Sequence, residues 1–242
     1  MNDTSIAMLT LSLALVSCMN TDHARTATAT AAAIEAPIDV VALVTGPLAA
    51  TSESQALDAL SRIPPSMARG EVSHDGFLNR DPGALRFLAI DGWRNAGSAS
   101  AFYASAPVRQ GFGELFAASP DVSVWTTRDG WKTWGSVSSA REPNAYTITL
   151  RGRIQGDAAQ GMSTHNHVVD AVPAPGPVGQ GNSAHLPLAN PDDPAELLIV
   201  EVWTNRGNQE ALYSDPQFQK ALGQFWVRPP QIAVWRNPNS AK

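Results

Sequence analysis

An internal repeat constrains the fold of this 242-residue chain more than any other feature of its sequence. The segment Phe87–Trp125 aligns without gaps on the segment Leu197–Trp235, at an offset of 110 residues. Self-similarity of this kind indicates repeated structural units, so we predict two homologous domains in tandem, at residues 38–136 and 143–237. Identical residues occupy several aligned positions: Trp93/Trp203, Asn95/Asn205, Gly97/Gly207, Tyr103/Tyr213, Gly113/Gly223, Pro120/Pro230 and Trp125/Trp235.

Each copy predicts the same succession of strands and helices. The apolar runs Phe87–Trp93 and Leu197–Trp203 have the composition of strands that are buried on both faces. A polar turn and a helix should follow each run. Val122–Trp125 and Ile232–Trp235 should then close each copy with a further strand.

The predicted helix of each copy has a capping residue and a break. Ser98 and Asn208 are expected at the N-cap, because their side-chain oxygens can accept a free backbone amide. Pro107 and Pro216 should bend or restart the helix, because proline removes an internal hydrogen bond.

The residues before each aligned segment complete a ferredoxin-like β-α-β-β-α-β order, which is an α+β fold class. Ser52–Gln55 is a capping-box pattern, and the matching helix of the second copy is predicted near Ser163–Val172. Pro173–Asn182 is predicted to be a loop from its composition. The other strands are predicted at Asp39–Thr45, Gly70–Leu78, Tyr146–Ile154 and Ala184–Ala189.

Composition excludes several classes of function. Hydrophobic residues make up 43% of the chain and charged residues 16%, which is a globular composition. A net charge of −5 provides no basic surface for a phosphate backbone, so nucleic acid is a poor partner. The single cysteine excludes a disulfide framework and a cysteine-rich metal site.

The N-terminal residues suggest export and lipid anchoring. The apolar run Ile6–Val16 is too short to span a bilayer and suits a signal peptide. Leu15–Cys18 resembles the lipobox of bacterial lipoproteins, which implies a signal peptide at residues 1–18, a lipidated Cys18 and a location in the bacterial cell envelope. Residues 19–37 would form a flexible tether. The alternative is an N-terminus without this role and a chance cysteine, since no Lys or Arg precedes the apolar run.

The segment Leu197–Leu222, with Glu201 and Trp203 at the end of a strand and a bend at Ser214–Phe218, resembles antibiotic biosynthesis monooxygenase-type domains. These belong to the dimeric α/β-barrel superfamily. The resemblance implies an eight-stranded barrel that two ferredoxin-like halves of one chain close around an apolar chamber, as a monomeric pseudo-dimer. It also implies a function among cofactor-independent oxygenases of phenols or quinols, haem-degrading enzymes, or relatives without known activity.

Two carboxylates beside tryptophans are candidate site residues. On a strand, Trp203 shares a face with Glu201, and Trp93 shares a face with Asp91. A carboxylate desolvated by indole neighbours would have a raised pKa and could act as a base on a phenol. The alternative is that the tryptophans are core residues and that the acids pair with arginines at the strand ends, such as Arg94 or Arg206.

The aligned asparagines and tyrosines are further candidates. Asn95 and Asn205 could donate to a substrate oxygen, although asparagine is also favoured by turn chemistry alone. Tyr103 and Tyr213 could orient a phenolate, or could lie as amphipathic residues at the rim between helix and sheet.

The histidines do not predict a metal site. His165 and His167 fall on a predicted helix, where positions two apart point in different directions, so His165 is expected inside and His167 in solvent. His74 and His185 fall near each other in the repeat alignment, on the second strands, and could contribute ligands to a metal site, but the sequence favours no metal site there.

Haem degradation is not expected. The axial histidine of haem-degrading relatives is replaced by Leu222, and Phe112 stands at the aligned position of the first copy. Neither side chain can ligate iron.

The sequence therefore predicts one of two functions, neither with a cofactor. The first is cofactor-independent monooxygenation of a small aromatic phenol or quinol, and the second is non-catalytic binding of a small hydrophobic or aromatic ligand by the same barrel. The second copy, which keeps the family pattern better, would supply a base (Glu201 or His165), an aromatic wall (Trp203) and orienting donors (Asn205 and Tyr213). The secondary candidates are their first-copy counterparts: Asp91, Trp93, Asn95 and Tyr103.

Overall fold

The computed structural model describes residue 38 and residues 40–61, 70–79, 83, 85–142 and 144–238, which belong to one structural unit spanning Ala36–Lys242. The predicted signal peptide at 1–18 and tether at 19–37 lie outside the described residues. Within the described residues, no helix combines the length and the apolar character needed to cross a membrane.

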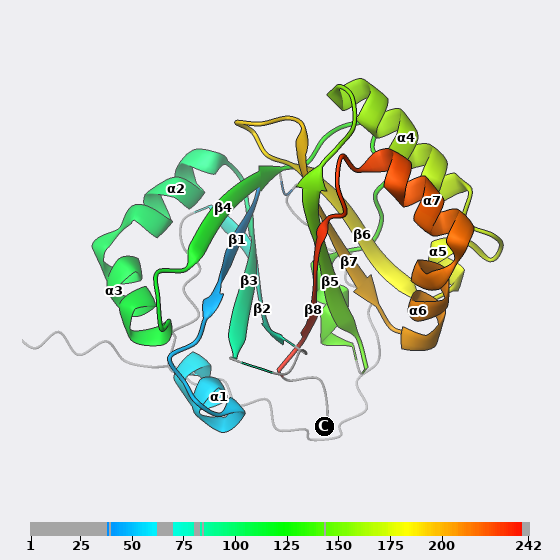
Figure 1. Cartoon of the computed structure of the whole chain (residues 1–242). Coiled ribbons are helices and arrows are strands. Elements are labelled where there is room, and N and C mark those ends of the chain that lie inside the picture. The colour runs from blue at the N-terminus through cyan, green and yellow to red at the C-terminus, as the bar shows by residue number, and fades with distance from the viewer. Residues whose placement is uncertain are drawn as a thin grey trace, which may run out of the picture. The chain divides into compact units, whose positions relative to one another are not determined.

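Eight strands and seven helices are named in the described residues (Figure 1). The first half comprises β1 (Val40–Pro47), α1 (Glu53–Ser61), β2 (Glu71–Asn79), β3 (Arg86–Trp93), α2 (Ala96–Ala104), α3 (Ala106–Leu115) and β4 (Asp121–Thr126). The second half comprises β5 (Tyr146–Arg153), α4 (Ala158–Asp170), α5 (Gly176–Gly179), β6 (Asn182–Ala189), β7 (Glu196–Trp203), α6 (Arg206–Ser214), α7 (Pro216–Phe225) and β8 (Gln231–Arg236). A 3-10 helix, η1 (Val137–Arg141), lies in the connection between them.

The strands form one closed antiparallel barrel in the order β1-β3-β2-β8-β5-β7-β6-β4. Within each half, neighbouring strands pair along nearly their whole length. The two seams between the halves are short. At one seam, Leu78 pairs with Arg236 and Asn79 with Trp235, and at the other Thr126 pairs with Ala189.

Side chains fill the inside of the barrel. Residues of both halves, among them Leu88, Ile90, Leu198 and Trp235, form one buried cluster there. An eight-stranded barrel has an interior just wide enough for its own side chains. The expected apolar interior is present but is packed with side chains, and the cavity described below lies outside it, beneath the helices of the second half.

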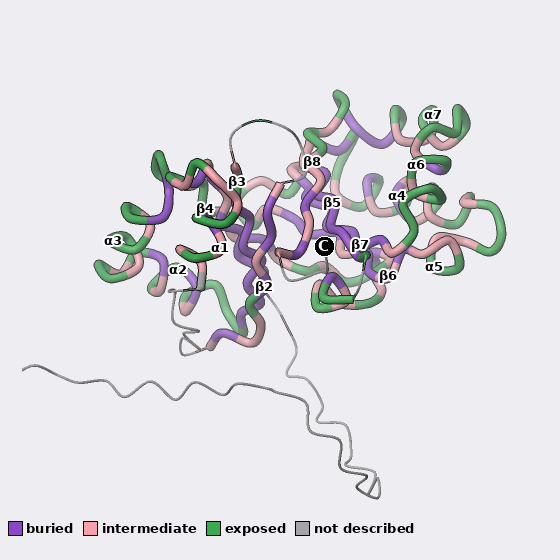
Figure 2. Tube along the Cα trace, turned by 90° about the horizontal axis from the view of Figure 1, so that it is seen from below, coloured by how far each residue is buried: buried purple, intermediate pink, exposed green. Residues whose placement is uncertain are grey.

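Helices cover the outer faces of the strands (Figure 1). In Figure 2 the strands are mostly buried, and the helices alternate between half-buried and exposed residues. On β7, Leu198 and Val200 face the barrel interior, whereas Ile199 and Trp203 belong to the cluster beneath the helices of the second half. Both faces of β7 are therefore buried, as the apolar composition of Leu197–Trp203 predicted.

Most predicted elements are confirmed, with local corrections at helix starts. The N-cap residues are Asn95 and Asn205, whose side-chain oxygens accept the amides of Ser98 and Asn208, so the prediction of Ser98 and Asn208 as caps is wrong. The helices begin directly after the asparagines, which places the predicted caps inside the first turn.

Two helical segments of the second half differ from the prediction, whereas the predicted helix breaks are confirmed. The helix predicted at Ser163–Val172 begins earlier, at Ala158, because Asp157 caps it. The segment Pro173–Asn182, predicted as a loop, contains the short helix α5. The predicted breaks are confirmed, because Pro107 and Pro216 lie in the first turns of the restarted helices α3 and α7.

Packing inside the barrel should dominate the stability of the chain. We expect Leu198→Ala, which truncates a side chain that is 2% exposed in that cluster, to lower the free energy of unfolding by about 2–5 kcal/mol. Val122→Ala, at a position on β4 that is 37% exposed, should change it by less than about 0.5 kcal/mol. Urea denaturation measures both values, and equal small effects would contradict the assignment of the core.

Candidate functional site

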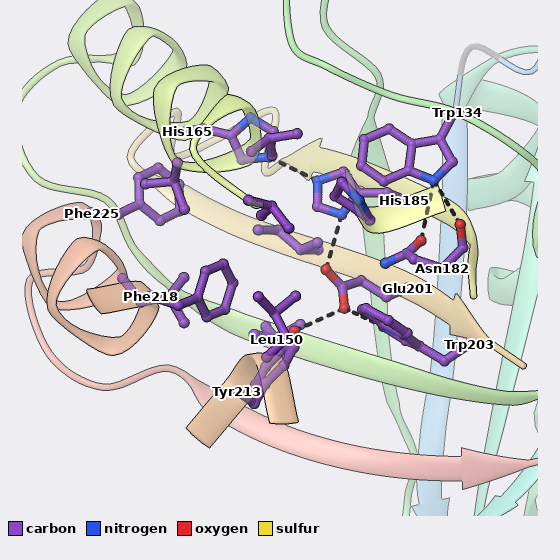
Figure 3. A pocket seen from close by; sticks show the side chains of 17 residues that line it. Trp134, Leu150, His165, Asn182, His185, Glu201, Trp203, Tyr213, Phe218 and Phe225 are labelled. Atoms are coloured by element: carbon purple, nitrogen blue, oxygen red, sulfur yellow. Dashed lines mark hydrogen bonds and ion pairs between the residues drawn. The ribbon is translucent and has the colours of Figure 1, made fainter. Parts of the chain in front are cut away.

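A small cavity lies in the second half, between the outer face of the sheet and the helices that cover it (Figure 3). Strand residues such as Leu150 and Ile199 form its floor, and helix residues such as Phe218 and Phe225 form its walls. Its volume is about 40 Å³. This is room for a few water-sized groups, and well below the ~300–1,000 Å³ of a pocket that holds a drug-sized ligand.

Glu201 is the carboxylate of this cavity, and three donors surround it. Its Oε1 accepts a hydrogen bond from Nδ1 of His185 at 3.0 Å. Its Oε2 accepts from the indole nitrogen of Trp203 at 2.7 Å and from the hydroxyl of Tyr213 at 2.8 Å. Glu201 and Trp203 meet because residues two apart on β7 share a face, as the sequence predicted.

These hydrogen bonds keep Glu201 ionised. Burial alone would raise the pKa of its carboxyl, but the three hydrogen bonds and the positive charge of His185 outweigh burial, so the pKa lies below its ordinary value. The expectation of a raised pKa is therefore wrong. The indole that was expected only to exclude water also donates a hydrogen bond to the carboxylate.

A chain of ring nitrogens extends from Glu201 to the helix α4. Nε2 of His185 lies 2.9 Å from Nε2 of His165, and Nδ1 of His165 lies 3.1 Å from Oδ1 of Asn166. The orientation of the Asn166 amide is fixed, because its nitrogen donates to the carbonyl of Gly130 and its oxygen accepts from the amide of Lys132.

The donors and acceptors between Asn166 and Glu201 determine which nitrogens of His165 and His185 carry protons. Oδ1 of Asn166 can only accept, so His165 carries a proton on Nδ1. Because the pKa of His165 is lowered to about 4, the ring carries no second proton at neutral pH, and its Nε2 is an acceptor. His185 must then donate from both nitrogens, to His165 and to Glu201, and is an imidazolium. A buried His185–Glu201 ion pair therefore stands beside a neutral His165.

The surroundings of both rings agree with this assignment. Burial and then the charge of His185 lower the pKa of His165 to about 4. The indole of Trp134 is stacked on His185, with ring centroids 4.6 Å apart and planes 15° apart. A cation over an indole face is attracted by the ring, so Trp134 stabilises the charged form of His185.

The structure brings some predicted site residues into the cavity and leaves others outside. Glu201, Trp203, Tyr213 and His165 all line it. Asn205 does not: its side chain is exposed and caps α6. The turn and cap role thus accounts for Asn205, and its predicted role as an orienting donor receives no geometric support.

The structure also tests the predicted orientation of the two helix histidines and the predicted partner of the strand carboxylate. His165 is buried and His167 is exposed on the same helix, as predicted. The expected pairing of the strand acid with Arg206 is wrong, because Arg206 forms its ion pair with Glu210. The partner of Glu201 is a histidine instead.

Sequence reasoning missed His185 and Trp134 as members of the site. His185 was noticed only as a possible metal ligand together with His74, yet each histidine pairs with the carboxylate of its own half. Trp134 comes from the connection between the halves, outside the aligned segments, so the repeat gave no signal for it. It reaches the site through a β-bridge to His185 and hydrogen bonds to Asn182.

The first half contains a related cluster around Asp91. Nδ1 of His74 lies 2.6 Å from Oδ1 of Asp91, and the hydroxyl of Tyr103 donates to Oδ2. Trp93 is fully buried next to Tyr103. Asn95 caps α2 and is exposed, like Asn205. The hydroxyls of both tyrosines therefore bind the carboxylates of the strands beneath them.

Comparison with known proteins supports the fold. No protein-family model and no curated protein matches the sequence. Similar solved structures include a candidate monooxygenase from Fusobacterium nucleatum (TM-score 0.59, 7% identity, 82% of this chain and 92% of that chain covered). Another is a candidate monooxygenase from Lactobacillus acidophilus (TM-score 0.56, 13% identity, 83% and 95% covered). A third is an anthrone oxidase-like protein (TM-score 0.58, 16% identity, 82% and 91% covered).

These identities are low, so the likeness shows the fold alone. The chain shares the fold of these candidate monooxygenases and of the anthrone oxidase-like protein, and its eight strands close into the barrel that the resemblance implied.

The lowered pKa of His165 predicts an acid-sensitive contribution to stability. In the unfolded chain this imidazole takes up a proton near pH 6.5, but in the folded protein only near pH 4. The folded state therefore binds fewer protons between these values, and about 3 kcal/mol of stability is present above pH 6.5 and lost as the pH falls to 4.

We expect His165→Gln, which keeps an acceptor for His185, to flatten the dependence of the urea midpoint on pH between 4 and 6.5 relative to the unsubstituted protein. His167→Gln, on the exposed side of α4, is the control and should keep the original slope. Parallel curves for all three proteins would contradict the neutral state of His165.

Proposed function

We propose that the protein is a cofactor-independent oxygenase of a small, electron-rich phenol or quinol, and that the second half carries the reaction. The observation that supports this most is the buried His185–Glu201 ion pair in an apolar cavity. A fixed cation in a water-poor site stabilises a developing oxyanion strongly. The fold, shared with an anthrone oxidase-like protein and candidate monooxygenases, is consistent with this chemistry.

In the proposed reaction, a phenol and dioxygen yield a quinone and water. The phenol first loses its proton to the ionised carboxylate of Glu201. The lowered pKa makes this carboxylate a weak base, so the transfer depends on the imidazolium of His185, which stabilises the resulting phenolate. The electron-rich ring reduces dioxygen: one oxygen atom forms the new carbonyl group, and the other leaves as water with two hydrogens from the substrate. Tyr213, whose pKa is raised by burial and by the charge of Glu201, remains a hydroxyl donor.

Size imposes a condition on this proposal. A cavity of about 40 Å³ accommodates dioxygen but not an aromatic ring. Trp134 is half-buried at the edge of the cavity and comes from the connection between the halves. We infer that it moves away from His185 when the aromatic substrate enters.

A non-catalytic binding protein is the second candidate function. The observation that favours it is the saturation of Glu201, whose two oxygens already accept three hydrogen bonds. In that case the pocket would bind a small hydrophobic or aromatic ligand without deprotonating it.

Oxygen uptake with a panel of quinols and dihydroxynaphthalenes tests the enzymatic proposal. We expect Glu201→Gln to lower kcat/KM by about 100-fold or more, because it removes the base and the partner of His185. Glu210→Gln makes the same chemical change at an exposed position of α6 and should retain the activity. Background rates for the unsubstituted protein would reject catalysis with these substrates, and quenching of tryptophan fluorescence by them would then support the binding function.

We also propose that the two halves are homologous ferredoxin-like domains, and that Cys18 carries a lipid anchor in a bacterial envelope. The repeat supports the first statement, and the lipobox-like Leu15–Cys18 supports the second.

Expression in a bacterial host tests the anchor. We expect Cys18→Ser to release the protein from the membrane fraction, because the acylated thiol is lost. Immunoblots of membrane and soluble fractions measure this. A variant that stays with the membrane as fully as the original chain would refute lipidation at Cys18.

A further inference from the structure

The cluster around Asp91 in the first half differs from its counterpart in one decisive position. The register of β2 and β6 places His74 opposite Asp91 and His185 opposite Glu201, so the two histidines are equivalent. By the same register Glu71 is equivalent to Asn182, since both pair with the tryptophan that ends the next strand. The first half thus gathers three ionisable side chains where the second gathers two and an amide.

These three side chains have the geometry of a metal site. One ligand atom each of Glu71, His74 and Asp91 lies within 4.8 Å of the others, with Nδ1 of His74 at 2.6 Å from Asp91 and 3.7 Å from Glu71. Ligands bound at ~2.1 Å around one ion are separated from each other by ~3–3.5 Å. Small side-chain shifts therefore suffice to place an ion between them.

Neighbouring residues prepare the ligands. Tyr103 donates to Oδ2 of Asp91 and so fixes the carboxylate with Oδ1 on the side of His74. Such hydrogen bonds orient ligands in metal sites. Arg141 binds Asp75 and the carbonyl of His74, so this guanidinium is engaged away from the carboxylate of Asp91.

The site is open on one side. The side chain of His74 is 55% exposed, whereas Glu71 and Asp91 are buried. In the second half, the side chain of the corresponding His185 is 6% exposed and lies between His165 and Trp134. An ion can therefore reach the first cluster from solvent.

We propose that Glu71, His74 and Asp91 bind one divalent transition-metal ion of the zinc or manganese type. One imidazole nitrogen with two carboxylate oxygens suits such borderline ions, whereas calcium and magnesium prefer oxygen ligands alone. The sequence did not predict this site, because its metal prediction depended on a pair of histidines and this site uses only one.

Isothermal titration calorimetry of the full chain, stripped of metal with a chelator, tests the proposal with Zn²⁺, Mn²⁺ and Ca²⁺. We expect one Zn²⁺ per chain, and binding of Ca²⁺ at least ~100-fold weaker. His74→Gln should weaken Zn²⁺ binding by ~100-fold or more, since even the loss of a residue that orients a ligand costs 10–100-fold. The substitution lies on an exposed side chain, so the fold should be retained, and circular dichroism verifies this.

Glu71→Gln is the second variant, and it should weaken Zn²⁺ binding likewise. His167→Gln, an exposed histidine on α4, is the matched control and should leave the affinity unchanged. No binding of Zn²⁺ or Mn²⁺, or equal Zn²⁺ affinity in the unsubstituted protein and His74→Gln, would overturn the proposal. None of these readouts depends on the oxygenase activity proposed for the second half.

Discussion

Side-chain packing inside the barrel joins the two halves of the molecule. The seams contribute only a few paired residues, so backbone hydrogen bonding alone would leave the halves weakly connected. The shared cluster, with Leu88 and Ile90 from one half and Leu198 and Trp235 from the other, supplies the apolar burial that closes the barrel. This packing also determines where chemistry is possible. With the interior filled, the polar residues of β3 and β7 lie on the outer face beneath the helices.

The buried ion pair of the second half is compatible with this environment because each polar group has a partner. Removing one partner of a buried pair leaves a charge without compensation, which is costly. His185 donates from both nitrogens, and Glu201 accepts from three side chains. In the first half, among the residues that the structure describes, Asp91 accepts from His74 and Tyr103, and this histidine faces solvent. The same fold thus holds one closed and one open carboxylate–histidine pair.

Much of the fold could be predicted from the sequence, because the repeat and the apolar runs fix the strands. Part of the site could also be predicted from the sequence. Strand periodicity correctly placed Glu201 and Trp203 on one face, and helical periodicity correctly placed His165 in the interior. The partner of Glu201, His185, could not be predicted, because their contact depends on how β6 pairs with β7. His74 precedes Asp91 by 17 residues, whereas His185 precedes Glu201 by 16, so the two histidines align at an offset that differs from the rest of the repeat. The role of Trp134 depends on tertiary structure alone.

Gly135 fixes the path of the connection at the point where it crosses β6. Its φ is +67°, and a Cβ atom there would lie 2.0 Å from the carbonyl oxygen of Ser183, so no other residue fits without displacing the backbone. The neighbouring Trp134 is consequently placed next to His185, on which its indole stacks. A polypeptide contains this connecting segment once, so it can cover only one of the two carboxylate–histidine clusters. A symmetric assembly of two separate subunits would instead leave both clusters equally exposed or equally covered. Joining the halves thus breaks their equivalence and lets a single molecule shelter one polar centre from water while leaving its twin in contact with the medium.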